Sequence, residues 1–214
     1  MSQRILGIFV AVLAVIGGAV LGNSLLRPAP EPPEPPEISG IYLPQARTLP
    51  EFELIHQTGR SLTNADLTGY WTFVYFGYTY CPDACPLTLA QLNVVDHQLK
   101  QRQAAQKVNY LLISVDPQRD TPERLAEYTA FFNPQFQGAT GEEEQLAQLA
   151  QAIGVFYRVP ENPEDPERYL VDHSSTVLVI NPDGALQAIF TPPQHADTMS
   201  AEFDLIRDHY YAYH

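Results

Sequence analysis

Two near-continuous apolar runs stand out in the chain, from Trp71 to Phe76 and from Tyr110 to Val115, and both are rich in aromatic and branched residues. Short runs of this kind are typical of strands that are buried on both faces of a sheet. Between them, leucine and valine recur at helical spacing from Leu89 to Leu99, and Pro86 suits the first position of such a helix. The pattern therefore predicts a strand–helix–strand unit.

The second half of the chain carries further helix and strand signals. Thr121-Pro122 predicts the start of another helix, and Thr140-Gly141-Glu142-Glu143 matches a capping box that would open a third one. Val177 to Ile180 and Ala185 to Phe190 predict two strands joined by an Asn-Pro-Asp-Gly turn, and we expect a closing helix from Thr198 to His209. This order of elements predicts an α/β fold of the thioredoxin-like sandwich type.

An apolar segment precedes this domain. Between Arg4 and Arg27 lie 22 uncharged residues, of which Ile5 to Gly22 are wholly apolar or glycine. A helix of that length, at about 1.5 Å per residue, spans a bilayer core of roughly 30 Å. A cleaved signal peptide is the alternative, but its apolar region is normally shorter and ends in an A-x-A-like site, which the sequence near Gly22 does not show. We expect residues 1–27 to form an uncleaved transmembrane anchor.

Residues 28–40 are expected to form a linker, because Pro28 to Glu37 reads PAPEPPEPPE. That composition cannot form a core and prefers extended polyproline II. The tail before the apolar segment is short, which leaves the domain at residues 41–214 as the translocated side. The sequence thus predicts a single-pass protein of the inner (cytoplasmic) membrane, with its soluble domain on the periplasmic, extracytoplasmic side.

The domain from Ile41 to His214 is strongly acidic, with 10 Lys plus Arg against 22 Asp plus Glu. Its length is sufficient for one domain with its own core. An acidic surface argues against nucleic acid as a partner and favours a partner with a basic docking patch.

The chain contains two cysteines, Cys81 and Cys85, and they lie four residues apart where the first strand feeds the first helix. Such a pair suits a thiophilic metal, a reversible disulfide or a structural disulfide. We expect Cys85 to lie in the first turn of the helix, where the partial positive charge lowers the thiol pKa and favours thiolate. His173 lies just before the later apolar strand, whose start would face the cysteine loop in a thioredoxin-like fold. Two sulfurs and one imidazole would make a trigonal site for a soft metal.

Three segments resemble the Sco/SenC family of membrane-tethered, thioredoxin-like copper proteins of respiratory assembly. They are Tyr78 to Pro86 (YTYCPDACP), Ser114 to Pro122 (SVDPQRDTP) and Asp172 to Ser175 (DHSS), in the order that the family has them. The resemblance runs from about Leu49 to the end of the chain. Three motifs in the family's order are specific, whereas any one of them alone would not be.

The resemblance implies a copper site made of Cys81, Cys85 and His173. Asp116 matches an acidic residue of the family near that site, although a turn residue before Pro117 is an equal alternative, and Asp83 lies between the two cysteines. Two thiolates and an imidazole suit Cu(I), and Cu(II) would add water or carboxylate ligands. The family delivers copper to the dinuclear copper centre of cytochrome c oxidase subunit II, which makes that subunit and other copper-delivery proteins the expected partners.

Three functions remain open on the sequence. The first is a copper chaperone, which is a metallochaperone rather than an enzyme. The second is a thiol-disulfide reductant that uses Cys81 and Cys85 as a redox pair and keeps the cysteines of the copper acceptor reduced; it gives His173 no role. The third, a peroxidase of the peroxiredoxin type with Cys81 as its reactive thiol, leaves His173 equally unexplained. The copper chaperone is the preferred interpretation.

Overall fold

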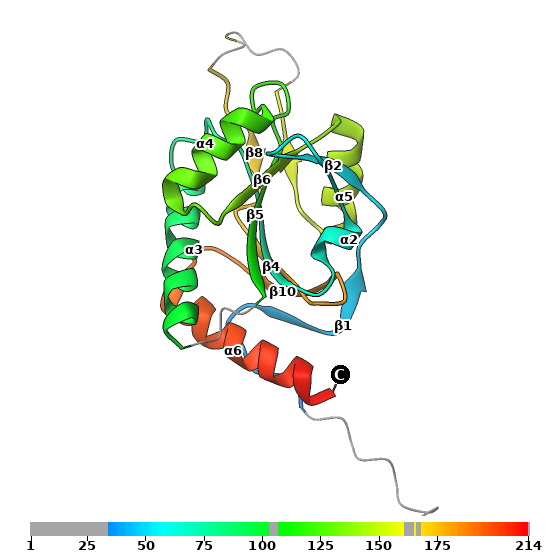
Figure 1. Ribbon diagram of the computed structural model, residues 1–214, viewed down its shortest axis with the longest axis vertical. Coiled ribbons are helices and arrows are strands. Elements are labelled where there is room, and N and C mark those ends of the chain that lie inside the picture. The colour runs from blue at the N-terminus through cyan, green and yellow to red at the C-terminus, as the bar shows by residue number, and fades with distance from the viewer. Residues whose placement is uncertain (1–33, 103–106, 161–164, 166–167, 214) are drawn as a thin grey trace, which may run out of the picture. The chain divides into compact units, whose positions relative to one another are not determined.

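Eight strands form one mixed sheet in the described part of the chain, which comprises residues 34–102, 107–160, 165 and 168–213 of a computed structural model (Figure 1). The strands are β1 (Ile41–Thr48), β2 (Glu53–His56), β3 (Ser61–Thr63), β4 (Trp71–Gly77), β5 (Val108–Ser114), β6 (Gln137–Thr140), β9 (Val177–Ile180) and β10 (Ala185–Phe190). Their order in the sheet is β1-β10-β9-β4-β5-β6-β2-β3. β5 runs parallel to both β4 and β6, and the other neighbouring strands are antiparallel.

Helices flank the central strands. The helices are α2 (Asn64–Leu67), α3 (Ala84–Gln101), α4 (Pro122–Phe132), α5 (Glu143–Ile153) and α6 (Ala196–Tyr213). In Figure 1, α3 and α4 lie to one side of the central strands and α2 and α5 lie to the other. A separate two-stranded sheet pairs β7 (Tyr157–Arg158) with β8 (Asp172–His173). This small sheet contains His173.

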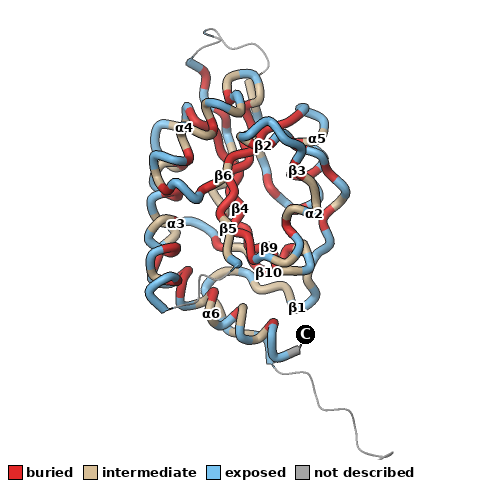
Figure 2. The backbone as a smooth tube through the Cα atoms, viewed as in Figure 1, coloured by how far each residue is buried: buried red, intermediate tan, exposed pale blue. Residues whose placement is uncertain are grey.

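The core is centred on β4 and β9, in which every residue is buried (Figure 2). Aromatic rings fill much of it. Phe73 of β4 stacks on Tyr110 of β5 at a ring-centre distance of 5.3 Å, and Trp71 meets Phe203 of α6 edge-on at 5.4 Å. Truncating a buried ring of this size to alanine costs about 3–5 kcal/mol of stability. These contacts stabilise the strands whose ends carry the site.

The main predicted elements are confirmed. The two apolar runs became β4 and β5, and β9 and β10 have the predicted bounds. The helix predicted to begin at Pro86 became α3, which begins two residues earlier at Ala84. Thr121 caps α4 by accepting a hydrogen bond from the N–H of Arg124. The closing helix is longer than predicted, since α6 runs from Ala196 to Tyr213.

One local prediction is wrong. Thr140 does not open a capping box for α5, because it ends β6 and pairs with Ile55 of β2, while Glu142 occupies the N-cap position. Pairing in the sheet has overridden the local capping signal. Tertiary contacts often override local preferences in this way.

The predicted membrane anchor at residues 1–27 lies outside the described residues, as does the linker up to residue 33. Among the residues that are described, none of the helices combines the length and the apolar character needed to cross a bilayer.

Candidate metal centre

The first candidate ligands lie in the loop after β4 and in the first turn of α3. β4 ends at Gly77, where an added Cβ would lie 2.8 Å from Cys85 Sγ and 2.9 Å from Tyr75 Cε1. Separations that short are not tolerated, so glycine allows the end of the strand to pass directly beside the sulfur. Cys81 follows in the loop, and Cys85 is the second residue of α3. The predicted position of both cysteines, between a strand and a helix, is confirmed.

The two cysteines are free and differ in exposure, since Cys81 is half-buried and Cys85 is fully buried. The backbone N–H of Cys85, at the N-terminus of α3, donates a hydrogen bond to Cys81 Sγ at 3.4 Å. The partial positive charge of the helix end is therefore directed at the preceding cysteine.

The two thiols also differ in acidity. A hydrogen bond from the Cys85 side chain outweighs the opposing effect of burial and lowers the pKa of Cys81 to about 3. The interaction with Cys81, followed by burial, raises the pKa of Cys85 well above its usual range. The prediction that the helix end would make Cys85 the thiolate is wrong, because its free N–H points at Cys81. The lowered pKa makes Cys81 the more acidic thiol of the pair.

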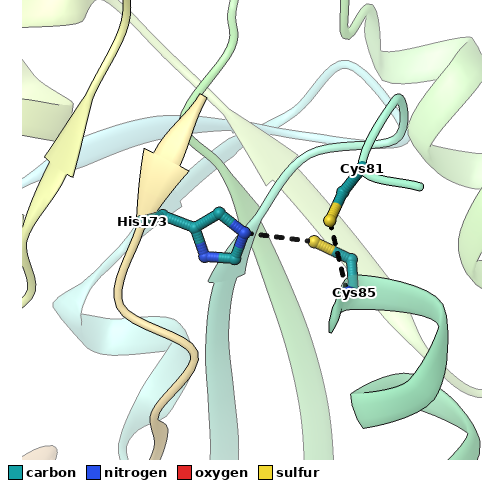
Figure 3. A group of neighbouring side chains, drawn as sticks. All are labelled: Cys81, Cys85 and His173. Atoms are coloured by element: carbon teal, nitrogen blue, oxygen red, sulfur yellow. Dashed lines mark hydrogen bonds between the residues drawn. The ribbon is translucent and has the colours of Figure 1, made fainter. Parts of the chain in front are cut away.

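His173 reaches the site from a distant part of the chain. It lies in β8, which is tied to β7, and Ser174 N–H donates to the Phe156 carbonyl at 2.7 Å. His173 Nδ1 lies 3.2 Å from the Ser174 carbonyl oxygen, which only accepts, so we assign the ring hydrogen to Nδ1. Nε2 keeps its lone pair and lies 3.5 Å from Cys85 Sγ (Figure 3).

Cys81, Cys85 and His173 therefore converge on one point, and their ligand atoms all lie within 4.8 Å of one another. In the described part of the chain this is the one cluster of at least three histidine, cysteine or acidic side chains that could hold a metal ion. Two thiolates and one imidazole form a donor set that fits Cu(I), whereas a structural zinc site normally has a fourth protein ligand. The predicted ligand set is chemically complete for a soft ion of low coordination number.

Two tyrosines enclose the imidazole. The rings of Tyr75 and Tyr78 meet the His173 ring edge-on at centre distances of 5.9 and 5.7 Å. Tyr78 also accepts a hydrogen bond from the N–H of Val171 at 3.2 Å. The cysteine loop thereby contacts the segment that carries His173.

The two predicted accessory aspartates lie outside this cluster. The Asp116 carboxylate is buried and already bonded, since Arg119 Nε and the Tyr169 hydroxyl each donate to it at 2.5 Å. Asp83 is exposed at the N-cap of α3 and makes no capping bond with its side chain. Neither aspartate belongs to the group of three ligand residues.

Arg119 is a residue that the sequence analysis missed. Its guanidinium carbon lies 3.5 Å from the ring centre of Tyr169 and 4.7 Å from that of Tyr80. Because Tyr80 directly precedes Cys81 and Tyr169 lies four residues before His173, Arg119 joins the two ligand-bearing segments. We call Asp116, Arg119, Tyr169 and Tyr80 the arginine clamp. The charged residues after β5 were the available signal, but Tyr169 lies too far away in sequence to be linked to them.

Comparison with known proteins gives a consistent result. A family model described as SCO1/SenC matches residues 42–206. The curated protein named "Protein SCO2 homolog, mitochondrial" from Bos taurus is 36% identical over 163 residues, which cover 76% of this chain and 60% of that protein. The chain thus spans less than two thirds of the length of that relative.

Two solved structures superpose closely. The crystal structure of Arabidopsis thaliana ScoI with copper bound has a TM-score of 0.69 at 32% identity, and the match covers 75% of this chain and 98% of that one. The structure of yeast Sco1 with copper bound has a TM-score of 0.70 at 28% identity, with coverage of 78% and 91%. These matches confirm the predicted mixed α/β, thioredoxin-like fold.

Proposed function

Because the chain belongs to the SCO1/SenC family, we propose that it is a copper-binding protein of cytochrome c oxidase assembly that holds copper through Cys81, Cys85 and His173. The observation that carries this proposal is the convergence of the three ligand atoms within 4.8 Å. The copper-bound relatives from Arabidopsis thaliana and yeast support the choice of metal.

The copper ion is cargo rather than a resident cofactor in this account. Cys81 and His173 are the ligands that an acceptor can reach, since both are only half-buried, whereas Cys85 is fully buried. Transfer would proceed by ligand exchange that begins at one of these two accessible ligands. Cu(I) fits the three ligands directly, and Cu(II) would need one or two further ligands such as water.

The acceptor in this proposal is the dinuclear copper centre of cytochrome c oxidase subunit II, and other copper-delivery proteins are candidate donors. The acidic domain supports docking to basic surfaces, because opposite charge steers association. We further propose that residues 1–27 anchor the chain in the inner membrane, that residues 28–40 act as a spacer, and that residues 41–214 face the periplasm.

A thiol-disulfide reductant is the second candidate. The lowered pKa of Cys81 favours it, because a half-buried thiolate can attack a disulfide and a second thiol lies beside it. In this alternative the protein keeps the copper-ligand cysteines of the same subunit reduced, and His173 is dispensable.

Complementation separates the two functions. We expect the His173→Ala variant to fail to restore oxidase assembly in a strain that lacks the protein, while its disulfide exchange rate on a model substrate stays near wild type. His97→Ala, which changes an exposed histidine on α3, is the matched control and should complement fully. Normal assembly by His173→Ala without added copper would favour the reductant.

A further inference from the structure

Tyr75 places a hydroxyl group against a proposed copper ligand. Its side chain is 0% exposed, and its hydroxyl donates a hydrogen bond to Cys85 Sγ at an O–S distance of 3.8 Å. The edge of the same ring meets His173, as described above. Tyr75 therefore touches two of the three proposed ligands.

The position of Tyr75 is fixed by the packing of β4. Its Cε1 atom and Cys85 Sγ would both collide with a Cβ at residue 77, so Gly77 permits the close approach of ring, sulfur and backbone. The hydroxyl of Tyr75 is a donor to this sulfur that a conservative substitution can remove.

We infer that Tyr75 is a positioning residue that donates a hydrogen bond to the Cys85 sulfur and so sets the relative affinity of the site for Cu(I) and Cu(II). This inference rests on the proposed function. A hydrogen bond withdraws electron density from a thiolate, which weakens its donation to Cu(II) more than to Cu(I). Hydrogen bonds to ligating sulfur are known to tune copper sites in this way.

The test compares Tyr75→Phe with Tyr110→Phe in the full chain. Tyr110 is a matched control, since it is 3% exposed on the neighbouring strand and its hydroxyl has no hydrogen-bond partner within the described residues. The measurements are the wavelength of the sulfur-to-Cu(II) charge-transfer band and the dissociation constants for Cu(I) and Cu(II). Thermal unfolding of both apoproteins verifies that each variant is folded.

For Tyr75→Phe we expect the charge-transfer band to move to longer wavelength and the ratio of the Cu(I) to the Cu(II) dissociation constant to rise about tenfold, equal to ~59 mV for one electron. Tyr110→Phe should match wild type in both the wavelength of the band and the ratio of the dissociation constants. Site-specific 3-fluorotyrosine at position 75, a stronger donor of the same shape, should move the band to shorter wavelength. The band of this 3-fluorotyrosine variant is also the deciding measurement if Tyr75→Phe does not fold.

Two results would overturn the inference. If Tyr75→Phe binds copper with the same band and the same two affinities as wild type, the hydroxyl has no such role while the copper site itself stands. An unshifted charge-transfer band in the fluorotyrosine variant would likewise show that the Tyr75 hydroxyl has no such role. A wild-type chain that binds no copper would instead refute the proposed function, and the inference with it.

Discussion

At the scale of single residues, the two cysteines have different tasks because their surroundings differ. Cys81 receives the hydrogen bonds of the helix end and of Cys85, and it is half-buried. Cys85 is enclosed by Gly77, Tyr75 and His173. The sequence predicted the pair and its place on the helix, but not which member ionises. That depended on where one backbone N–H points.

Selective alkylation should reveal this difference. Because the pKa of Cys81 is lowered from 9.0 to about 3, its thiolate is present at pH 5, whereas Cys85 with its raised pKa remains a thiol. Iodoacetamide at pH 5 should therefore label Cys81 and leave Cys85 unmodified in the reduced, metal-free protein, as read by peptide mass spectrometry. In denaturant the preference should vanish. Faster labelling of Cys85 in the folded protein would show that the assignment is reversed.

At the scale of elements, the site depends on two short strands that no apolar run in the sequence predicts. β7 and β8 are two residues each, and their pairing joins positions 14 and 16 residues apart. β4, β5 and β9 could be predicted because burial on both faces leaves a continuous apolar run. The position of His173 beside Cys85, 88 residues away, could be expected only through the fold as a whole.

The arginine clamp should contribute to stability because its central ion pair is buried. The side chains of Arg119 and Asp116 are 6% and 1% exposed, whereas those of Arg158 and Asp172 are 72% and 63% exposed. Leaving a buried carboxylate without its partner costs about 3–5 kcal/mol, and an exposed pair contributes about 0–1 kcal/mol. Arg119→Gln should therefore lower the free energy of unfolding in urea far more than Arg158→Gln. Equal losses would show that the clamp does not support the fold.

At the scale of the whole molecule, one pair of sulfurs serves either copper binding or a disulfide, and the two states exclude each other. The chain has no other cysteine to substitute for them. Its redox state must therefore decide whether it can accept copper. The family, the fold and the three candidate ligands were all accessible from the sequence because three separated motifs occur in order. The arginine clamp was not, since its members meet only after folding.

Oxidation should consequently abolish copper uptake. A disulfide between Cys81 and Cys85 removes both sulfur ligands, so the fully oxidised chain should bind copper only after reduction. Competition against a copper chelator before and after treatment with a reductant measures this directly. Undiminished affinity in the oxidised chain would exclude the two cysteines as ligands.

The most direct test of the central claim is a titration of the reduced, full chain with Cu(I) in competition with a chromophoric chelator. Wild type and His97→Ala should each bind one ion per chain with equal affinity. His173→Ala should bind at least ~100-fold more weakly, since loss of even an outer-sphere partner of a metal ligand costs roughly 10–100-fold. A His173→Ala chain that binds one Cu(I) as tightly as wild type would contradict the proposed site.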